Sequence, residues 1–260
     1  MSTESAPPKN EKEMTFLEHL EELRWRLVRS IIAIVVGSVI AFIFKTEILD
    51  FLIYPFSEAA KLASEDVSNG FVSDTKLIYL APTEAFMVYI KLALFAGLFI
   101  SSPYIFYQLW KFIAPGLMEN EKKYVPYFVF FSTFFFLAGA FFCYFVVIKI
   151  GLHFLLSFQT ENLEANFAIK EYLKFVTLMI LTFGIVFEMP ILSYFLTRVG
   201  LLTPKFMREK RRFGIIAIFA LAAIMTPPDP FSQVALALPL VVLYEFSIWV
   251  SKVALPKETT

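Results

Sequence analysis

Histidine and cysteine, the side chains that most often bind metals or act as catalytic bases and nucleophiles, are nearly absent from this sequence. Its 260 residues include one cysteine and two histidines. Cys143 lies inside an apolar run, and His19 and His153 are isolated from each other and from it. A disulfide framework is therefore excluded, and a metal site has no support. With no glycine-rich phosphate-binding motif and no nucleophile–base pairing either, the sequence predicts no cofactor, no metal and no enzyme.

Charge is scarce too. Charged residues make up 18% of the chain, and 23 basic residues balance 23 acidic ones, which argues against a nucleic-acid partner. Hydrophobic residues make up 58%, with 32 phenylalanines, and the mean hydropathy is +0.68. This composition predicts an all-α polytopic membrane protein. The polar N-terminus lacks the basic-then-apolar order of a cleaved signal peptide, so we expect the first apolar segment to be retained.

Six apolar runs predict six transmembrane helices, at residues 27–44, 85–110, 125–148, 172–196, 213–225 and 231–250. Together they are expected to form a single membrane domain, residues 15–252. A disordered cytoplasmic tail (1–14) precedes it, and a second cytoplasmic tail (253–260) follows it.

Two further segments are expected at the far membrane surface. Residues 45–83 are too polar to span, and their amphipathic part, interrupted at Pro55, is expected to lie along that surface. Residues 150–170 are expected to form a loop on the same side.

The basic residues predict the orientation. Every arginine lies either before residue 30 or between residues 198 and 212, and several lysines accompany them. By the positive-inside rule, both termini and the loop 112–123 (FIAPGLMENEKK) are cytoplasmic.

The last two helices are predicted to be short. As a helix, run 213–225 would reach only about 20 Å, against about 30 Å of hydrocarbon. The following turn, TPPDP at 226–230, cannot extend it because proline cannot continue a helix. We therefore expect a short final hairpin with its tip below the outer surface, which either thins the bilayer or opens a concave face.

Glu188 is the acid placed deepest in an apolar run, roughly 15 Å from Arg198 at the helical rise. Charged side chains at such depth are costly and usually functional. Alternatively, its carboxyl group is a structural hydrogen-bonding partner of a neighbouring helix, next to the helix break that Pro190 imposes. Glu245 lies nearer the cytoplasmic end, where we favour a structural role.

The acids Glu22 and Glu121 lie on two separate cytoplasmic elements. Beside basic neighbours such as Arg24 and Arg26, they are either a solvated face of mixed charge or a groove that binds guanidinium groups. Gln108 and Gln233 lie at the ends of predicted spans. Each is either an interhelical hydrogen-bonding residue or a residue turned to lipid headgroups.

Five motifs occur in order along the chain: HLEELRWRL, PTEAF, YQLWKFIAPGLMENEKK, FGIVFEMP and TPPDPFSQ. Together they resemble the TatC family, the receptor subunit of the twin-arginine protein translocase. The match extends from about Thr15 to about Lys252, with six spans in the family's order. One mild departure is Lys122-Lys123, where relatives often carry arginine.

The resemblance implies export of folded proteins across the bacterial cytoplasmic (inner) membrane, driven by the proton-motive force. It implies that Glu22 and Glu121 recognise the paired arginines of signal peptides, flanked by Arg24, Arg26 and Phe112. TatA- and TatB-type single-span subunits are implied to dock along the last two spans, within an oligomeric receptor complex surrounded by lipid. The residues expected to serve partner docking or to be polar within the membrane are Glu188, Gln108, Thr226, Asp229, Gln233 and Pro55.

The alternative is a proton-coupled membrane transporter that uses Glu188 and Glu245 as a relay. Such a transporter needs polar residues spread over several spans, and most spans here have few. An inverted internal repeat, typical of secondary transporters, is not visible either. The sequence therefore favours the receptor.

Overall fold

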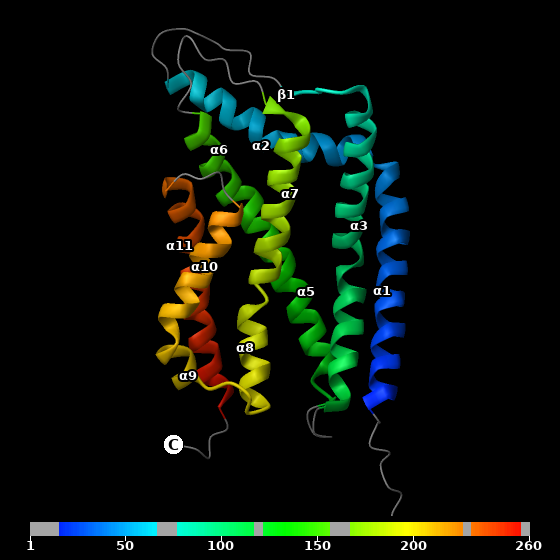
Figure 1. The fold of residues 1–260 in the computed structure, drawn as a ribbon, viewed down its shortest axis with the longest axis vertical. Helices are drawn as coiled ribbons and strands as arrows, with labels where there is room; N and C mark the ends of the chain where they lie inside the picture. The colour runs from blue at the N-terminus through cyan, green and yellow to red at the C-terminus, as the bar shows by residue number, and fades with distance from the viewer. Residues whose placement is uncertain (1–15, 67–76, 117–121, 157–166, 226–229, 256–260) are drawn as a thin grey trace, which may run out of the picture.

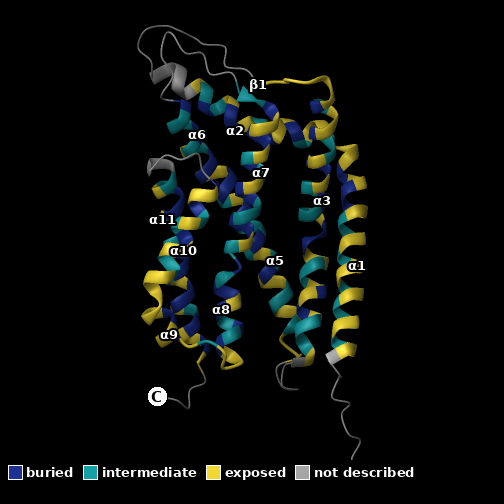
Figure 2. Cartoon of the chain, in the orientation of Figure 1, coloured by how far each residue is buried: buried dark blue, intermediate teal, exposed yellow. Residues whose placement is uncertain are grey.

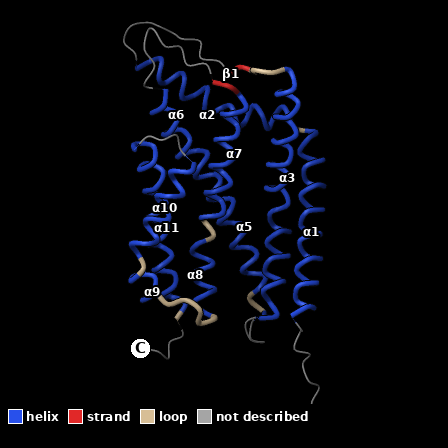
Figure 3. The backbone as a smooth tube through the Cα atoms, in the orientation of Figure 1, coloured by secondary structure: helices blue, strands red, loops and turns tan. Residues whose placement is uncertain are grey.

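The computed structural model of the chain is a bundle of long helices, shown as a ribbon in Figure 1 and as a backbone tube in Figure 3. It describes residues 16–66, 77–116, 122–156, 167–225 and 230–255. Nearly all of these residues are helical, as the sequence predicts. They also include a parallel pair of two-residue strands that the sequence did not indicate, β1 (Leu77–Ile78) and β2 (Phe167–Ala168).

In chain order the helices are α1 (Phe16–Ile43), α2 (Lys45–Asp66), α3 (Pro82–Ile113), the 3-10 turn η1 (Ala114–Gly116), α5 (Val125–Phe142), the π-helical turn η2 (Cys143–Val147), α6 (Ile148–Leu156), α7 (Ile169–Val186), α8 (Met189–Arg198), α9 (Pro204–Glu209), α10 (Arg211–Met225) and α11 (Pro230–Ala254). Helix α1 packs chiefly against α3, α5 against α7, and α8 against α11. The beginning of α1 and the ends of α3, α8 and α11 lie at one end of the bundle, which we call the terminal face, and α2 crosses the other end (Figure 1).

In the described residues, five helical stretches are long and apolar enough to cross a membrane. They are Leu17–Ile43, Pro82–Ile113, Val125–Leu156, Ile169–Arg198 and Gln233–Ala254. Much of α1 is exposed (Figure 2), and Ile31, Val35 and Val39 are each more than half exposed. In water such a surface would be a liability, whereas in a bilayer it contacts lipid.

The last two helices differ in length. Helix α10 has 15 residues, too few to cross the hydrocarbon layer at full thickness, as predicted. Helix α11 has 25 residues and reaches about 37 Å, so the prediction that it is short is wrong. It starts at Pro230 because a helix's first turn needs no N–H from proline. It continues past Val250 because the hydroxyl of Ser251 is buried in a hydrogen bond of 2.6 Å with Thr197 of α8.

Pro55 does not interrupt α2, contrary to the sequence prediction. A proline inside a helix leaves the carbonyl four residues earlier without its donor. Here Tyr144 donates its hydroxyl proton to that carbonyl, on Phe51, and Tyr172 donates to the carbonyl of Leu52 at 2.7 Å. Tyr144 of η2 therefore replaces the donor that Pro55 lacks, and Tyr172 of α7 adds a second hydrogen bond to the same turn, which the local sequence does not reveal.

Residues 150–156 form the end of a helix and not the expected loop. The helix continues from α5 through η2 into α6, which packs against α2. Leu152 and Leu156 are 5% and 2% exposed, and burying each such side chain contributes about 1.5–3 kcal/mol. Contact with α2 thus stabilises the last two turns of α6, in the part of the chain that the sequence predicts to be a loop.

The fourth membrane-crossing stretch is broken at Phe187 and Glu188, between α7 and α8, as predicted. Pro190 cannot donate to the carbonyl of Val186, so the regular helix ends there. The end of α7, just before the break, packs closely against α5. A Cβ atom added at Gly139 would lie 2.7 Å from the carbonyl oxygen of Phe183.

Candidate functional site

Two glycines bring α1 and α3 into direct contact. A Cβ atom added at Gly37 would lie 2.8 Å from the carbonyl oxygen of Gly97, and one added at Gly97 would lie 2.5 Å from the backbone nitrogen of Ser38. Real Cβ atoms essentially never approach so closely. Any side chain would therefore push the helices apart. The contact also fixes how the polar residues near the start of α1 face those near the end of α3.

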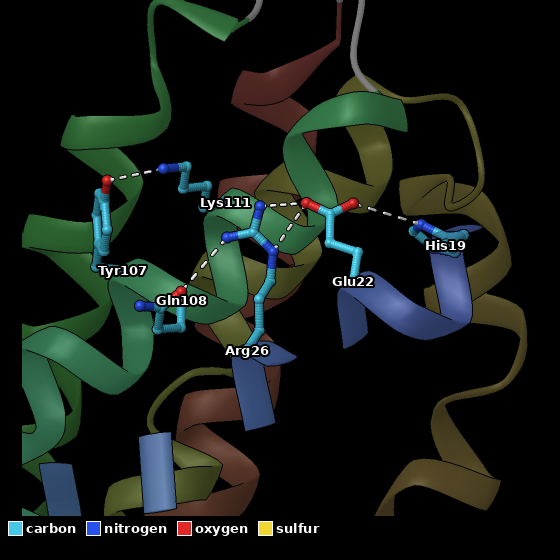
Figure 4. Close-up of polar contacts among 6 residues, drawn as sticks. All are labelled: His19, Glu22, Arg26, Tyr107, Gln108 and Lys111. Atoms are coloured by element: carbon cyan, nitrogen blue, oxygen red, sulfur yellow. Dashed lines mark hydrogen bonds and ion pairs between the residues drawn. The ribbon is translucent and has the colours of Figure 1, made fainter. Parts of the chain in front are cut away.

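Glu22 and Arg26 link these two helices. They are four residues apart on α1, one helical turn, and form an ion pair through the guanidinium and carboxylate Oε1 (Figure 4). The Nη1 of Arg26 also donates to the side-chain carbonyl of Gln108 on α3, at 3.4 Å. Arg26 is only 11% exposed, so its charge is largely shielded from solvent.

The second carboxylate oxygen of Glu22 faces a pair of stacked aromatic rings. The ring of His19 stacks on Phe112 at 4.4 Å between centroids, and its Nδ1 lies 4.0 Å from Oε2 of Glu22. That oxygen is buried and has no hydrogen-bond partner among the described residues. We call His19, Glu22, Arg26, Gln108 and Phe112 the α1–α3 cluster.

The α1–α3 cluster can bind a cation with several donors. A carboxylate offers two oxygens, and Arg26 occupies only one of Glu22's. A buried acceptor without a partner is costly, by about 1–3 kcal/mol, which a ligand that supplies a donor would recover. Next to the cluster on α3, the Nζ of Lys111 donates a hydrogen bond of 3.3 Å to the hydroxyl of Tyr107 (Figure 4).

The structure thus brings four of the sequence-predicted residues together: Glu22, Arg26, Gln108 and Phe112. Arg24 is exposed on α1, and no hydrogen bond or ion pair joins it to them in the described part of the chain. Sequence reasoning missed His19, although its spacing of three residues from Glu22 places the two on one helix face.

The remaining predicted residues lie elsewhere. Glu121, Thr226 and Asp229 lie outside the described residues. Gln233 donates to the carbonyl of Phe219 at 3.1 Å and so joins α11 to α10. Pro55 lies in α2, at the end of the bundle opposite the terminal face.

Glu188 belongs to a second polar cluster, inside the bundle. It is 8% exposed, and its carboxyl group lies beside Ser132 of α5, which is 1% exposed. Ser132 in turn accepts a hydrogen bond of 2.9 Å from the indole nitrogen of Trp110 on α3. The Oε1 atom of Glu188 has no partner among the described residues. Three elements therefore converge on one buried carboxyl group with an open oxygen.

Glu245 takes no part in that cluster and is paired with Arg211 of α10. This pairing matches the structural role favoured from the sequence. A proton relay from Glu188 to Glu245 would have no direct contact between the two carboxyl groups. In the described ranges, no group of three histidine, cysteine or acidic side chains lies close enough to hold a metal ion.

The fold and the two clusters define a class: a multi-pass helical membrane protein with a polar surface at one end and a buried carboxyl group in its interior. The family model described as "Sec-independent protein translocase protein (TatC)" matches residues 18–239. The chain therefore belongs to the TatC family. It is a component of the Tat protein translocase in the inner membrane, and not an enzyme.

Relatives and solved structures agree. A TatC protein of Desulforapulum autotrophicum is 41% identical over 92% of this chain and 85% of its own length. One of Helicobacter pylori is 42% identical over 92% of this chain and 89% of its own. A crystal structure titled "Twin Arginine Translocase Receptor- TatC" superposes with a TM-score of 0.80 at 38% identity, covering 91% of this chain and 99% of that one.

Proposed function

We propose that the chain is the signal-peptide receptor of a twin-arginine translocase and that the α1–α3 cluster forms half of its recognition site. The observation that carries this proposal is the buried, unpartnered Oε2 of Glu22. It lies at the terminal face, the end of the bundle at which α9 and the start of α10 also lie (Figure 1). A solved relative with the same fold is titled a twin-arginine translocase receptor.

In this proposal, Arg26 holds Glu22 in place while an incoming arginine binds its second oxygen. Arginine suits this role because its planar guanidinium matches a carboxylate with two parallel hydrogen bonds. The stacked rings of His19 and Phe112 form a flat wall beside the carboxylate. Glu121, which follows α3 in the sequence, supplies the second carboxylate for the second arginine, with Arg24 as a flanking residue.

The proposed topology has six spans, with both termini in the cytoplasm. Helix α10 is the fifth span in chain order and α11 the sixth, and the membrane around α10 is thin. Residues 15–252 are one membrane domain between the tails 1–14 and 253–260. The common location of the start of α1 and the end of α11 supports this arrangement, and so does the gathering of arginines there (Figure 1).

TatA- and TatB-type single-span subunits are the proposed partners, together with folded cargo and the lipid around an oligomeric receptor. They dock along α10 and α11, near Thr226, Asp229 and Gln233. The buried, unpartnered Oε1 of Glu188 accepts a hydrogen bond from a polar group on such a partner once docking gives access to it. The proton-motive force drives export.

Removing either acid should weaken binding of a twin-arginine signal peptide. Glu22→Gln and Glu121→Gln each replace a charge-assisted hydrogen bond worth about 1.5–3 kcal/mol, so we expect roughly 10- to 100-fold lower affinity. The measurement is equilibrium binding of a fluorescent signal peptide to the purified full-length chain. Glu21→Gln, an exposed neighbour on α1, is the matched control and should bind normally. Unchanged affinity in both test variants refutes the assignment, and a loss confined to low salt indicates only a diffuse surface field.

A further inference from the structure

A recess of about 430 Å³ lies among α9, α10 and α11, apart from both clusters described above. Its lining is mostly charged: Arg208, Arg211, Glu245, Ile248, Trp249 and Lys252. The signal-peptide proposal uses none of these residues.

The recess has a positive charge that the described residues do not neutralise. Glu245 pairs with Arg211, so these two charges cancel. Arg208 and Lys252 are exposed and have no acidic partner among the described residues. Two unpaired basic groups on different helices, facing one recess, form a site for an anion.

Its surroundings are those of a membrane interface. Trp249 lines the recess and is 58% exposed. Nearby, the guanidinium of Arg212 lies 4.9 Å from the ring centroid of Phe213, which is also more than half exposed. Aromatic and basic side chains combine in this way at the depth of lipid headgroups. From Trp249, an exposed apolar stripe continues along α11 through Val242 and Leu238, at helical spacing.

We propose that this recess binds the headgroup of an anionic glycerophospholipid from the surrounding membrane. The phosphate lies between Arg208 and Lys252, and an acyl chain extends along Val242 and Leu238. Basic recesses between membrane helices suit such headgroups because charge attraction adds to burial of the acyl chain. This inference stands whether or not the α1–α3 cluster binds signal peptides.

The test compares two double variants of the purified full-length chain. Phosphatidylglycerol, phosphatidylcholine or sodium phosphate is titrated in mixed detergent micelles, and the shift in the thermal unfolding midpoint gives the apparent affinity. We expect stabilisation by phosphatidylglycerol alone. Arg208→Gln/Lys252→Gln should weaken it on the order of 30-fold, since each basic residue contributes about fivefold. Lys205→Gln/Arg212→Gln removes the same two charge types outside the recess and should leave it unchanged.

Glu245→Gln gives a result of opposite sign. It releases Arg211 to the headgroup, so phosphatidylglycerol should bind about fivefold more tightly. This variant adds net positive charge without removing a basic residue, and it tests the site even if the double variant fails to fold. Equal losses in both double variants, or equal stabilisation by phosphatidylcholine, would overturn the proposal. So would an equal effect of free phosphate, which would identify an anion site that does not select lipid.

Discussion

Gly97→Ala should lower the free energy of unfolding by about 1–3 kcal/mol and strongly reduce signal-peptide binding. The new methyl group would press on the backbone of Ser38, which cannot rotate away as a flexible side chain can. Because α1 and α3 must then separate, Arg26 would lose its hydrogen bond with Gln108 and His19 its stacking on Phe112. Thermal unfolding and peptide affinity, measured on the same preparation, test both effects.

Gly151 provides the matched control. It also lies within a helix, α6, but a Cβ atom added there meets nothing within 4 Å. Gly151→Ala should therefore be neutral or stabilise by roughly 0.5–1 kcal/mol, because alanine favours the helix. If the two alanine variants have the same stability and the same peptide affinity, the contact between α1 and α3 does not position the site.

The second large effect concerns Glu188. Glu188→Ala should strongly impair transport and crosslinking to single-span partners, because it empties a buried site and removes the acceptor beside the buried hydroxyl of Ser132, at a cost of about 1–3 kcal/mol. Glu188→Gln keeps the size and the hydrogen-bonding capacity and should retain a substantial part of both activities. Signal-peptide binding should stay normal in both variants, since the α1–α3 cluster does not include this residue.

The comparison of the two variants distinguishes docking from proton transfer. A glutamine cannot release a proton, so a relay requires Glu188→Gln to be as inactive as Glu188→Ala. Crosslinking measured in parallel shows whether the partner is still bound when transport fails. Normal transport by Glu188→Ala contradicts both roles and leaves a structural one.

Features set by local chemistry were predictable from the sequence. The break between α7 and α8 follows from Pro190, and the shortness of α10 follows from its position between a basic loop and a proline-rich turn. The helical membrane class follows from composition alone.

Features set by distant contacts were not predictable. The continuity of α2 through Pro55 depends on Tyr144 and Tyr172, which lie roughly a hundred residues further along the chain. The extension of α11 depends on Thr197 of α8.

The α1–α3 cluster also combines features that the sequence predicts with features that depend on distant contacts. Family resemblance gave Glu22, Arg26 and Phe112 as binding residues, and their spacing on single helices is readable from the sequence. Gln108 was assigned to the intramembrane polar group, and the structure places it against Arg26 instead. That placement depends on the register between α1 and α3, which the Gly37–Gly97 contact fixes and no single-helix pattern reveals.

The central claim is that Glu22 and Glu121 recognise paired arginines by geometry as well as by charge. Its most direct test is equilibrium binding of a twin-arginine signal peptide and its Lys-Lys variant to the wild-type chain. Lysine keeps the charge but lacks the planar fork that binds a carboxylate with two hydrogen bonds. We predict that the twin-arginine peptide binds at least about tenfold more tightly, and that Glu22→Gln largely removes this preference. Equal affinity for the two peptides on the wild-type chain would contradict the account.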